Sequence, residues 1–307
     1  MLVFTMFKKV IIMAVIIFSV HSAYAKDVSN VTPIEESDQQ INEFSLSGYA
    51  DKGKKNWDLA GKTADIFDTT VKLTDVVGNM YGETENIKIT SKKGDFDKVE
   101  GKVHLEDDVV ITTTSGAKLT TESLDWDRKH QLLSSKDRVN IEKENMVTTA
   151  IGIKGEPNLN KVNLEKDVQV EINPTKPGTK NAPEIKDKVI ITCDGPLEID
   201  YEKNIAVFKN NVKADNKDSL IYCDIMDVYF AKADKDAPKV ADASASLMNS
   251  KIDKLLCHGH VKITKGSNTS YSEEATYSAI DKKIILTGRP KLELYSTEDF
   301  KGMFTVN

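Results

Sequence analysis

Hydrophobic and polar residues alternate along the stretch from Gly101 to Ile141. Val103 and Leu105 are separated by polar residues, and Val139 repeats the pattern further along the chain. A period of two residues places apolar side chains on one face of a strand and polar side chains on the other. The stretch therefore predicts short β-strands with one apolar face and one solvated face.

The same pattern recurs in the second half of the chain. Each copy has a polar strand with an aromatic residue, then a charged turn, then an apolar run. The copies span Leu119–Ile141, Leu197–Ala214 and Thr269–Leu294. Because such a unit cannot bury its apolar face alone, we expect neighbouring copies to stack into one continuous β structure.

Composition narrows the class of protein. Of the 307 residues, 39% are hydrophobic and 29% are charged, which indicates an ordered, soluble chain with a core. The net charge of −6 argues against a nucleic-acid partner, because nucleic-acid domains normally carry a basic surplus on one face. Cys193, Cys223 and Cys257 are too few for disulfides to build the fold, and we expect them as buried residues on strands.

The N-terminal segment has the features of an export signal. Lys8 and Lys9 precede the apolar run Val10–Val20, and Ala23-Tyr24-Ala25 supplies small residues of the kind that a signal peptidase recognises. We expect residues 1–25 to be a signal peptide or, alternatively, an N-terminal membrane anchor. The mainly polar residues 26–43 are expected to be a tether.

The order of the segments resembles a known family. A signal or anchor, a tether, the segment Trp57–Ala64, the turn Ile89–Lys98 and the strands at Gly101–Asp127 together resemble LptC, the periplasmic bitopic component of the lipopolysaccharide export machine. The segment Leu255–Leu294 resembles the OstA/LptA-like modules of the same pathway. Together the resemblance covers residues 44–295. The chain departs from the pattern in being longer than a typical LptC.

The resemblance implies an all-β fold, namely an OstA-like β-jellyroll of stacked antiparallel strands with an open-ended, V-shaped groove. An LptC-like jellyroll is expected at residues 44–173 and an OstA/LptA-like jellyroll at 188–307. Between them, residues 174–187 are rich in proline, which removes ladder donors and bends the chain. This segment is expected to be either a linker between two modules or a loop projecting from one stack.

The implied function is a non-enzymatic bridge for lipopolysaccharide. It would pass lipid across the periplasm from the inner-membrane ABC transporter complex to the outer membrane. Its partners would be the acyl chains of lipid A, that transporter complex and an LptA-like bridge protein, and no cofactor or metal is implied. Leaving a chain of about twelve carbons in water costs on the order of 10 kcal/mol, so a crossing lipid needs a continuous apolar shield.

The candidate site consists of the inward apolar positions and the edge strands. For each inward residue, ordinary core packing is an interpretation at least as good as lipid contact. The candidate lining residues are Val103, Leu105, Val109, Ile111, Leu119, Val139, Ile141, Val168, Val170, Leu197, Ile199, Val212, Val261, Ile263, Leu292 and Leu294. Unpaired main-chain groups on terminal strands can extend a neighbour's sheet. By analogy with the family, the expected edge residues are Trp57, Leu59 and Ala60 toward the membrane complex, and Ile284, Leu286 and Leu294 toward the next module.

Groups that suggest other chemistry have simpler interpretations. On a strand, His258 and His260 share one face and Cys257 lies on the other, so the three do not converge on a metal. The pairs Asp107-Asp108 and Glu273-Glu274 are expected on solvated surfaces rather than in a catalytic site. The alternatives to lipid transport are an exported structural or adhesive β-solenoid whose apolar face is only its core and, third, a periplasmic enzyme.

Overall fold

The computed structural model describes most of the chain beyond its N-terminal segment. The described residues are 37–49, 53–82, 85–156, 161–174, 187–231, 252–281 and 283–295. Apart from residue 37, they fall in one compact unit, residues 38–307. The expected signal or anchor at 1–25 lies outside them. A helix long and apolar enough to cross a membrane does not occur in the part of the chain that is described.

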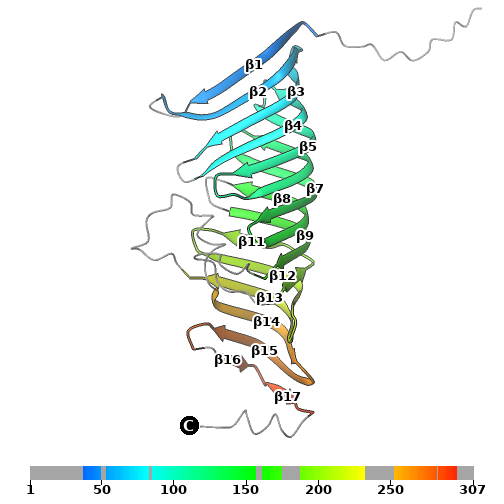
Figure 1. Ribbon diagram of the computed structural model, residues 1–307, viewed down its shortest axis with the longest axis vertical. Helices are drawn as coiled ribbons and strands as arrows, with labels where there is room; N and C mark the ends of the chain where they lie inside the picture. Colours follow the sequence, from blue (N-terminus) through cyan, green and yellow to red (C-terminus); the bar gives the residue numbers. More distant parts are fainter. Residues whose placement is uncertain are drawn as a thin grey trace, which may run out of the picture. The chain divides into compact units, whose positions relative to one another are not determined.

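The regular structure of these residues consists entirely of β-strands (Figure 1). The strands are β1 (Gln39–Tyr49), β2 (Lys55–Ile66), β3 (Thr70–Tyr81), β4 (Asn86–Asp97), β5 (Lys102–Thr113), β6 (Lys118–Asp127), β7 (Leu132–Lys143), β8 (Met146–Glu156), β9 (Lys161–Ile172), β10 (Val189–Cys193), β11 (Leu197–Asp200), β12 (Ile205–Asn216), β13 (Ser219–Phe230), β14 (Ile252–Lys265), β15 (Asn268–Ser278), β16 (Lys283–Thr287) and β17 (Lys291–Glu293). The all-β prediction is confirmed.

The strands form one antiparallel sheet whose order follows the chain. Strands β10 and β11 together occupy one position between β9 and β12, and β16 and β17 together occupy one position beside β15. Pairing continues from β9 to β10, where Ile172 lies opposite Val189. Residues on both sides of the Pro-rich segment therefore belong to the same sheet.

Strand β1 begins inside the segment that was expected to be a tether. It starts at Gln39, which lies opposite Ile66 of β2, and most of its side chains are exposed. Main-chain pairing with β2 holds this strand, so it does not need the apolar alternation that marks the other strands. For this reason the polar sequence at the start of β1 did not predict a strand.

Most of the long strands carry a β-bulge near the middle. Asp107 and Asp108 form the bulge of β5, with φ angles of 62° and 54°, and Asn210 and Asn211 form that of β12. Asp and Asn tolerate this left-handed region better than most residues. A bulge bends its strand, so a line of bulges across neighbouring strands bends the whole sheet. The Asp107-Asp108 pair is thus a bend, where Lys93 approaches Asp107 at 2.8 Å.

Apolar side chains on the inner face of the bent sheet form two cores. The first includes Leu59, Leu105 and Trp126, and the second includes Val139 and Met226. Leu119 packs against both cores, so they adjoin at β6 and β7. The three cysteines are free thiols buried in the second core, as the sequence predicts.

His104 provides a test of surface electrostatics on β5. Its Nδ1 lies 2.7 Å from Asp125 Oδ1 and its Nε2 lies 3.0 Å from Glu106 Oε1. Burial disfavours the charged imidazolium, but the hydrogen bonds to the two carboxylates outweigh burial and raise the pKa of His104. A pKa raised in the folded state stabilises the protein below the unfolded value of about 6.5, and this stabilisation is lost as pH rises through the folded pKa.

We therefore expect His104→Gln to lower the melting temperature at about pH 5.5 and to change it much less at about pH 8.5. Thermal melts of both proteins at the two pH values measure the difference. The same decrease at both pH values would contradict a role for imidazole charge.

Candidate functional site

The bend brings opposite ends of different strands into contact. Trp57 lies near the start of β2, beside the β1–β2 turn, whereas Trp126 lies near the end of β6, beside the β6–β7 turn. These turns are on opposite sides of the sheet, and an extended strand of this length spans about 36 Å. Nevertheless, the two indole centroids are 6.0 Å apart in an edge-to-face arrangement. The sheet is therefore folded into two limbs that enclose its inner face.

One continuous row of directly opposed residues crosses the first limb, which carries the β1–β2 turn. We call it the first row. Its members are Leu46, Leu59, Gly78, Ile89, Ile111, Leu119, Ile141, Thr148, Val170, Ile191, Ala214, Ile221, Ile263, Ser270 and Leu292. It contains no charged side chain between β1 and β17.

A second row crosses the other limb, which carries the β6–β7 turn. Its members are Val71, Phe96, Val103, Trp126, Leu133, Gly155, Val162, Ile199, Ala206, Val228, Leu255, Tyr277 and Ile284. This row also lacks charge. Side chains of both rows contribute to the two cores, so the limbs present apolar surface toward the enclosed space.

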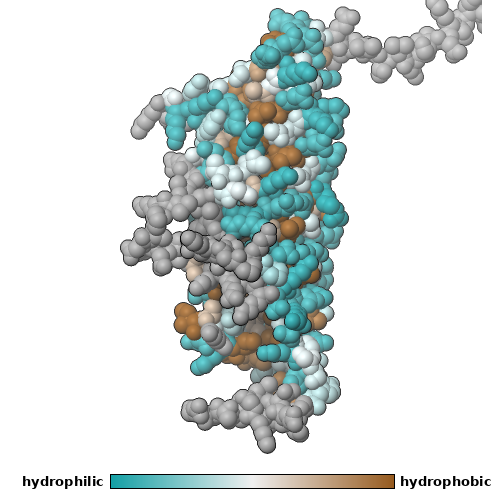
Figure 2. All heavy atoms as spheres, in the orientation of Figure 1, coloured by the Kyte–Doolittle hydropathy of each residue, from teal (hydrophilic) through white to brown (hydrophobic). Residues whose placement is uncertain are grey.

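The first row is closed from β2 to β5, and both rows are partly open further along the sheet. Leu59, Ile89 and Ile111 expose 7% of their surface or less. From β6 onward, half-buried aliphatic residues join the rows. They are Leu119, Ile141, Val162, Ile199, Ala214, Ile221, Leu255 and Ile263. Figure 2 shows hydrophobic side chains reaching the surface between hydrophilic ones on one face of the protein.

The predicted lining residues differ in depth. Ten are buried, namely Val103, Leu105, Val109, Ile111, Val139, Val168, Val170, Leu197, Val212 and Val261. Five are half-buried, namely Leu119, Ile141, Ile199, Ile263 and Leu294. Leu292 of β17 is 47% exposed. The half-buried residues keep some exposed surface in this structure, whereas the buried ones would gain exposure only if the limbs separated.

Arg128 packs against the contact between the limbs. Its guanidinium carbon lies 4.5 Å from the ring centre of Trp57 and 4.4 Å from that of Phe96. Its Nε donates a hydrogen bond to the carbonyl oxygen of Gly101 at 2.9 Å, and burial lowers the pKa of the guanidinium. We call Trp57, Phe96, Trp126 and Arg128 the aromatic clasp. Arg128 lies in the turn that follows β6, and no local signal in the sequence marks its contact with Trp57.

The N-terminal edge strand is β1 rather than the strand that the sequence suggested. Trp57, Leu59 and Ala60 lie on β2, which pairs with β1 on one side and with β3 on the other. The prediction that these three residues lie on an edge strand is therefore wrong. Within the described residues β1 pairs only with β2, and it exposes 43% of Ile41 and 41% of Leu46.

The C-terminal edge residues lie at the last position of the described sheet. Ile284 and Leu286 are on β16, which pairs only with β15 among these residues, and Leu294 directly follows β17. Ile284 and Ile285 are 56% and 59% exposed. Both ends of the described sheet thus combine unpaired main-chain groups with exposed apolar side chains.

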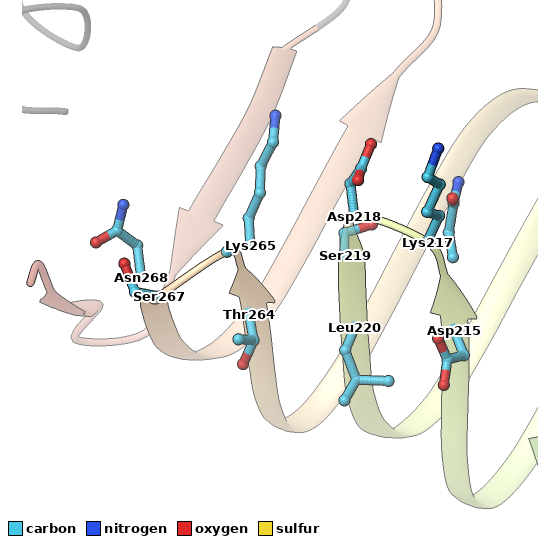
Figure 3. Close-up of a pocket in the computed structure, with 11 residues that line it drawn as sticks. Asp215, Lys217, Asp218, Ser219, Leu220, Thr264, Lys265, Ser267 and Asn268 are labelled. Carbon is cyan, nitrogen blue, oxygen red and sulfur yellow. The ribbon is translucent and has the colours of Figure 1, made fainter. Parts of the chain in front are cut away.

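A hollow of about 780 Å³ lies at the neighbouring tips of the β12–β13 and β14–β15 hairpins (Figure 3). Its lining includes Asp215, Lys217, Asp218, Lys265 and Asn268. Most of the lining side chains are polar or charged, Leu220 lies among them, and the hollow is open to solvent rather than enclosed.

The histidines near Cys257 do not gather around it. Cys257 is buried in the second core, whereas His260 is exposed and lies 2.8 Å from Asp224 Oδ2 through its Nδ1. His258 lies 3.6 Å from carboxylate oxygens of both Asp227 and Glu274. These contacts are between imidazole and carboxylate groups at or near the surface.

Two family models match the chain. Residues 10–173 match the family described as lipopolysaccharide-assembly, LptC-related, and this match covers more than half of the 307 residues. The chain belongs to the LptC-related family. Residues 195–303 match the family of LptA and LptD N-terminal domain lipopolysaccharide transport proteins. The predicted resemblance to LptC with a C-terminal LptA-like segment is confirmed. Comparison with curated proteins finds no match.

The LptC-related segment and the LptA/LptD-like segment are joined within the sheet. The first match ends one residue after β9, and the second begins at Gly195, between β10 and β11. Strands β10 and β11 both pair with β9, through contacts such as Ile191 opposite Val170 and Leu197 opposite Leu164. One strand ladder therefore runs through both family segments.

Proposed function

We propose that this LptC-related chain is a non-enzymatic lipid conduit that binds the acyl chains of lipopolysaccharide along its two apolar rows. The observation that carries the proposal is the continuity of these rows, which cross both family segments without a charged side chain. Each methylene group removed from water contributes about 0.8 kcal/mol, so an unbroken apolar path lets a chain advance without exposure to water. Both matched families belong to lipopolysaccharide assembly and transport, which supports this ligand.

The two ends of the sheet would join the chain to its neighbours in the periplasm. Strand β1 would extend a sheet of the inner-membrane transporter complex, and β16 with β17 would extend that of an LptA-like bridge protein. Exposed Ile41 and Leu46 at one end, and Ile284 and Ile285 at the other, support this assignment. Residues 1–25 would direct export or anchor the chain. Photo-crosslinks from β1 to a component on the outer-membrane side, and from β16 to the transporter, would show the opposite orientation of the chain. That result would contradict this assignment.

The lipid path can be tested with two adjacent residues of β13. Ile221 lies in the first row opposite Ile263, whereas Leu220 lies opposite Thr264 and points to the other face. Both are half-buried aliphatic residues, so they differ mainly in direction. We expect a photo-crosslinking residue at 221 to yield lipopolysaccharide adducts in cells, and one at 220 to yield far fewer.

The outcomes separate the conduit from its main alternative. Adducts at 221 alone would support lipid contact on the inner face. Absence of adducts at 221, 141 and 263, in variants that fold and are exported, would contradict the conduit and favour a structural scaffold whose inner face is a dry core. Equal labelling at 220 and 221 would indicate nonspecific contact and would also contradict the proposed path.

A further inference from the structure

Two of the three cysteines meet in the second core, on neighbouring strands. Cys223 of β13 and Cys257 of β14 are free thiols that expose 5% and 1% of their surface. A hydrogen bond links their side chains. The two sulfur atoms are therefore close to each other before any covalent bond joins them.

A β-bulge brings this pair together. Cys257 lies opposite Met226, whereas the β13–β14 ladder skips Cys223 at the bulge. A bulge bends its strand and leaves residues out of the ladder, so main-chain hydrogen bonds do not fix the spacing at this point. Beside the pair the strands approach closely, because a Cβ on Gly259 would lie 3.0 Å from Cβ of Asp224. The bend thus lets two diagonal inner positions meet and leaves their spacing adjustable.

The third cysteine provides an internal comparison. Cys193 is 4% exposed and belongs to the same core, but it lies on β10 opposite Val168. Its thiol is hydrogen-bonded to the main chain at Lys209 and Gly195. Burial alone therefore does not set Cys223 and Cys257 apart, whereas their mutual contact does.

We propose that Cys223 and Cys257 form a disulfide bond when the chain folds in an oxidising compartment. Disulfides form and persist in the bacterial periplasm. That the chain reaches the periplasm rests on the proposed function and on the export signal expected at residues 1–25. The bond would fix the spacing of β13 and β14 at the bend, within the segment that matches the LptA and LptD N-terminal family.

The oxidant is a second disulfide, carried by a small molecule or by an oxidoreductase. One cysteine thiolate attacks it, which forms a mixed disulfide and releases one thiol of the oxidant. The other cysteine thiolate then attacks the protein sulfur of the mixed disulfide and releases the second thiol. The two protein thiols thereby lose two protons and two electrons, and the oxidant is reduced to two thiols.

The surroundings of the pair determine when the bond forms. The hydrogen bond with Cys257, together with burial, raises the pKa of the Cys223 thiol. The thiolate is the reactive form, and buried thiols are inert. Oxidation is therefore expected during folding, before β13 pairs with β14, and is expected to be much slower once the reduced chain has folded.

Refolding of the full chain in a glutathione redox buffer tests the bond. The reaction is stopped with acid, free thiols are alkylated under denaturing conditions and counted by mass spectrometry, and peptides mapped without reductant identify the bonded pair. Cys223→Ala and Cys257→Ala each remove one partner, and Cys193→Ala is the matched control. We expect one free thiol in wild type, none in Cys193→Ala, and no intramolecular bond in the other two variants.

Thermal melts give an independent readout. Reduction of the oxidised protein should lower the melting temperature of wild type and of Cys193→Ala by about 5–10 °C, because the bond constrains the unfolded chain. Reductant should leave the melting temperatures of Cys223→Ala and Cys257→Ala unchanged. If an alanine variant does not fold by circular dichroism, the peptide map of wild type decides the question.

Other outcomes overturn the proposal or part of it. Three free thiols in refolded wild type, a bond that includes Cys193, or a bond between two chains would each overturn it. A bond formed on refolding but absent from the exported chain, trapped with acid in cells, would overturn its formation in the periplasm. Equal oxidation rates for folded and unfolded chains would contradict the role of burial. Lipid adducts at residue 221 without the bond overturn only the bond, and the bond without adducts overturns only the conduit.

Discussion

Replacing Trp126 with alanine should lower the free energy of unfolding by about 3–5 kcal/mol, the usual range for deletion of a buried tryptophan. Trp126 is the largest fully buried side chain of the described residues. It belongs to the first core and also touches Trp57 of the opposite limb, so its removal leaves a cavity at the place where the limbs meet. Urea unfolding followed by far-ultraviolet circular dichroism measures the change.

Trp57→Ala is the matched control for this prediction. Trp57 takes part in the same edge-to-face contact but is only half-buried, so its removal should destabilise the protein less. A decrease below about 1 kcal/mol for Trp126→Ala would show that the ring does not support the closed sheet. An equal decrease for both variants would attribute the stability to the ring pair rather than to burial in the core.

Gly195→Ala is expected to destabilise the junction between the two family segments by at least about 2 kcal/mol. Gly195 has a φ of +101°, in a region that residues with a Cβ rarely adopt. A Cβ at this position would also lie 2.3 Å from the carbonyl oxygen of Glu165, a backbone atom of β9 that cannot move alone. Chemical unfolding of the variant measures the loss.

Gly116→Ala separates backbone strain from this clash. Gly116 has a φ of +84°, but a Cβ there would meet no atom within 4 Å. This variant should therefore lose only about 1 kcal/mol, the contribution of the unfavourable φ. If the two variants were equally destabilised, the close approach of β9 to Gly195 would not matter for stability.

Alternation and internal repetition made most of the fold predictable. The apolar positions Val103, Leu105 and Val139 are buried on the expected face, and the recurring unit forms the expected stack. Strand β1 escaped the same reasoning because most of its side chains are exposed, and main-chain pairing with β2 rather than an alternating apolar pattern defines it. The error then shifted the expected edge onto Trp57, since a strand looks terminal when its neighbour is not recognised.

The aromatic clasp was beyond sequence reasoning for a different reason. Trp57 and Arg128 are far apart in the sequence, since Trp57 lies near the start of β2 and Arg128 directly follows β6, so only the bend of the sheet brings them together. That bend depends on bulges such as Asp107-Asp108, which in the sequence look like ordinary surface carboxylates. The candidate lining was predictable as a set of inward positions, but the depth of each residue depends on how closely the limbs approach.

The ladder between β9 and β11 has a consequence for assembly. When two separate proteins pair by their edges, the fraction joined depends on their concentrations and falls on dilution. Here the LptC-related and LptA/LptD-like segments belong to one chain, and their pairing, such as Leu164 opposite Leu197, is intramolecular. Its high effective concentration keeps the joint closed when the protein is scarce, and the ratio of the two segments is fixed at one to one.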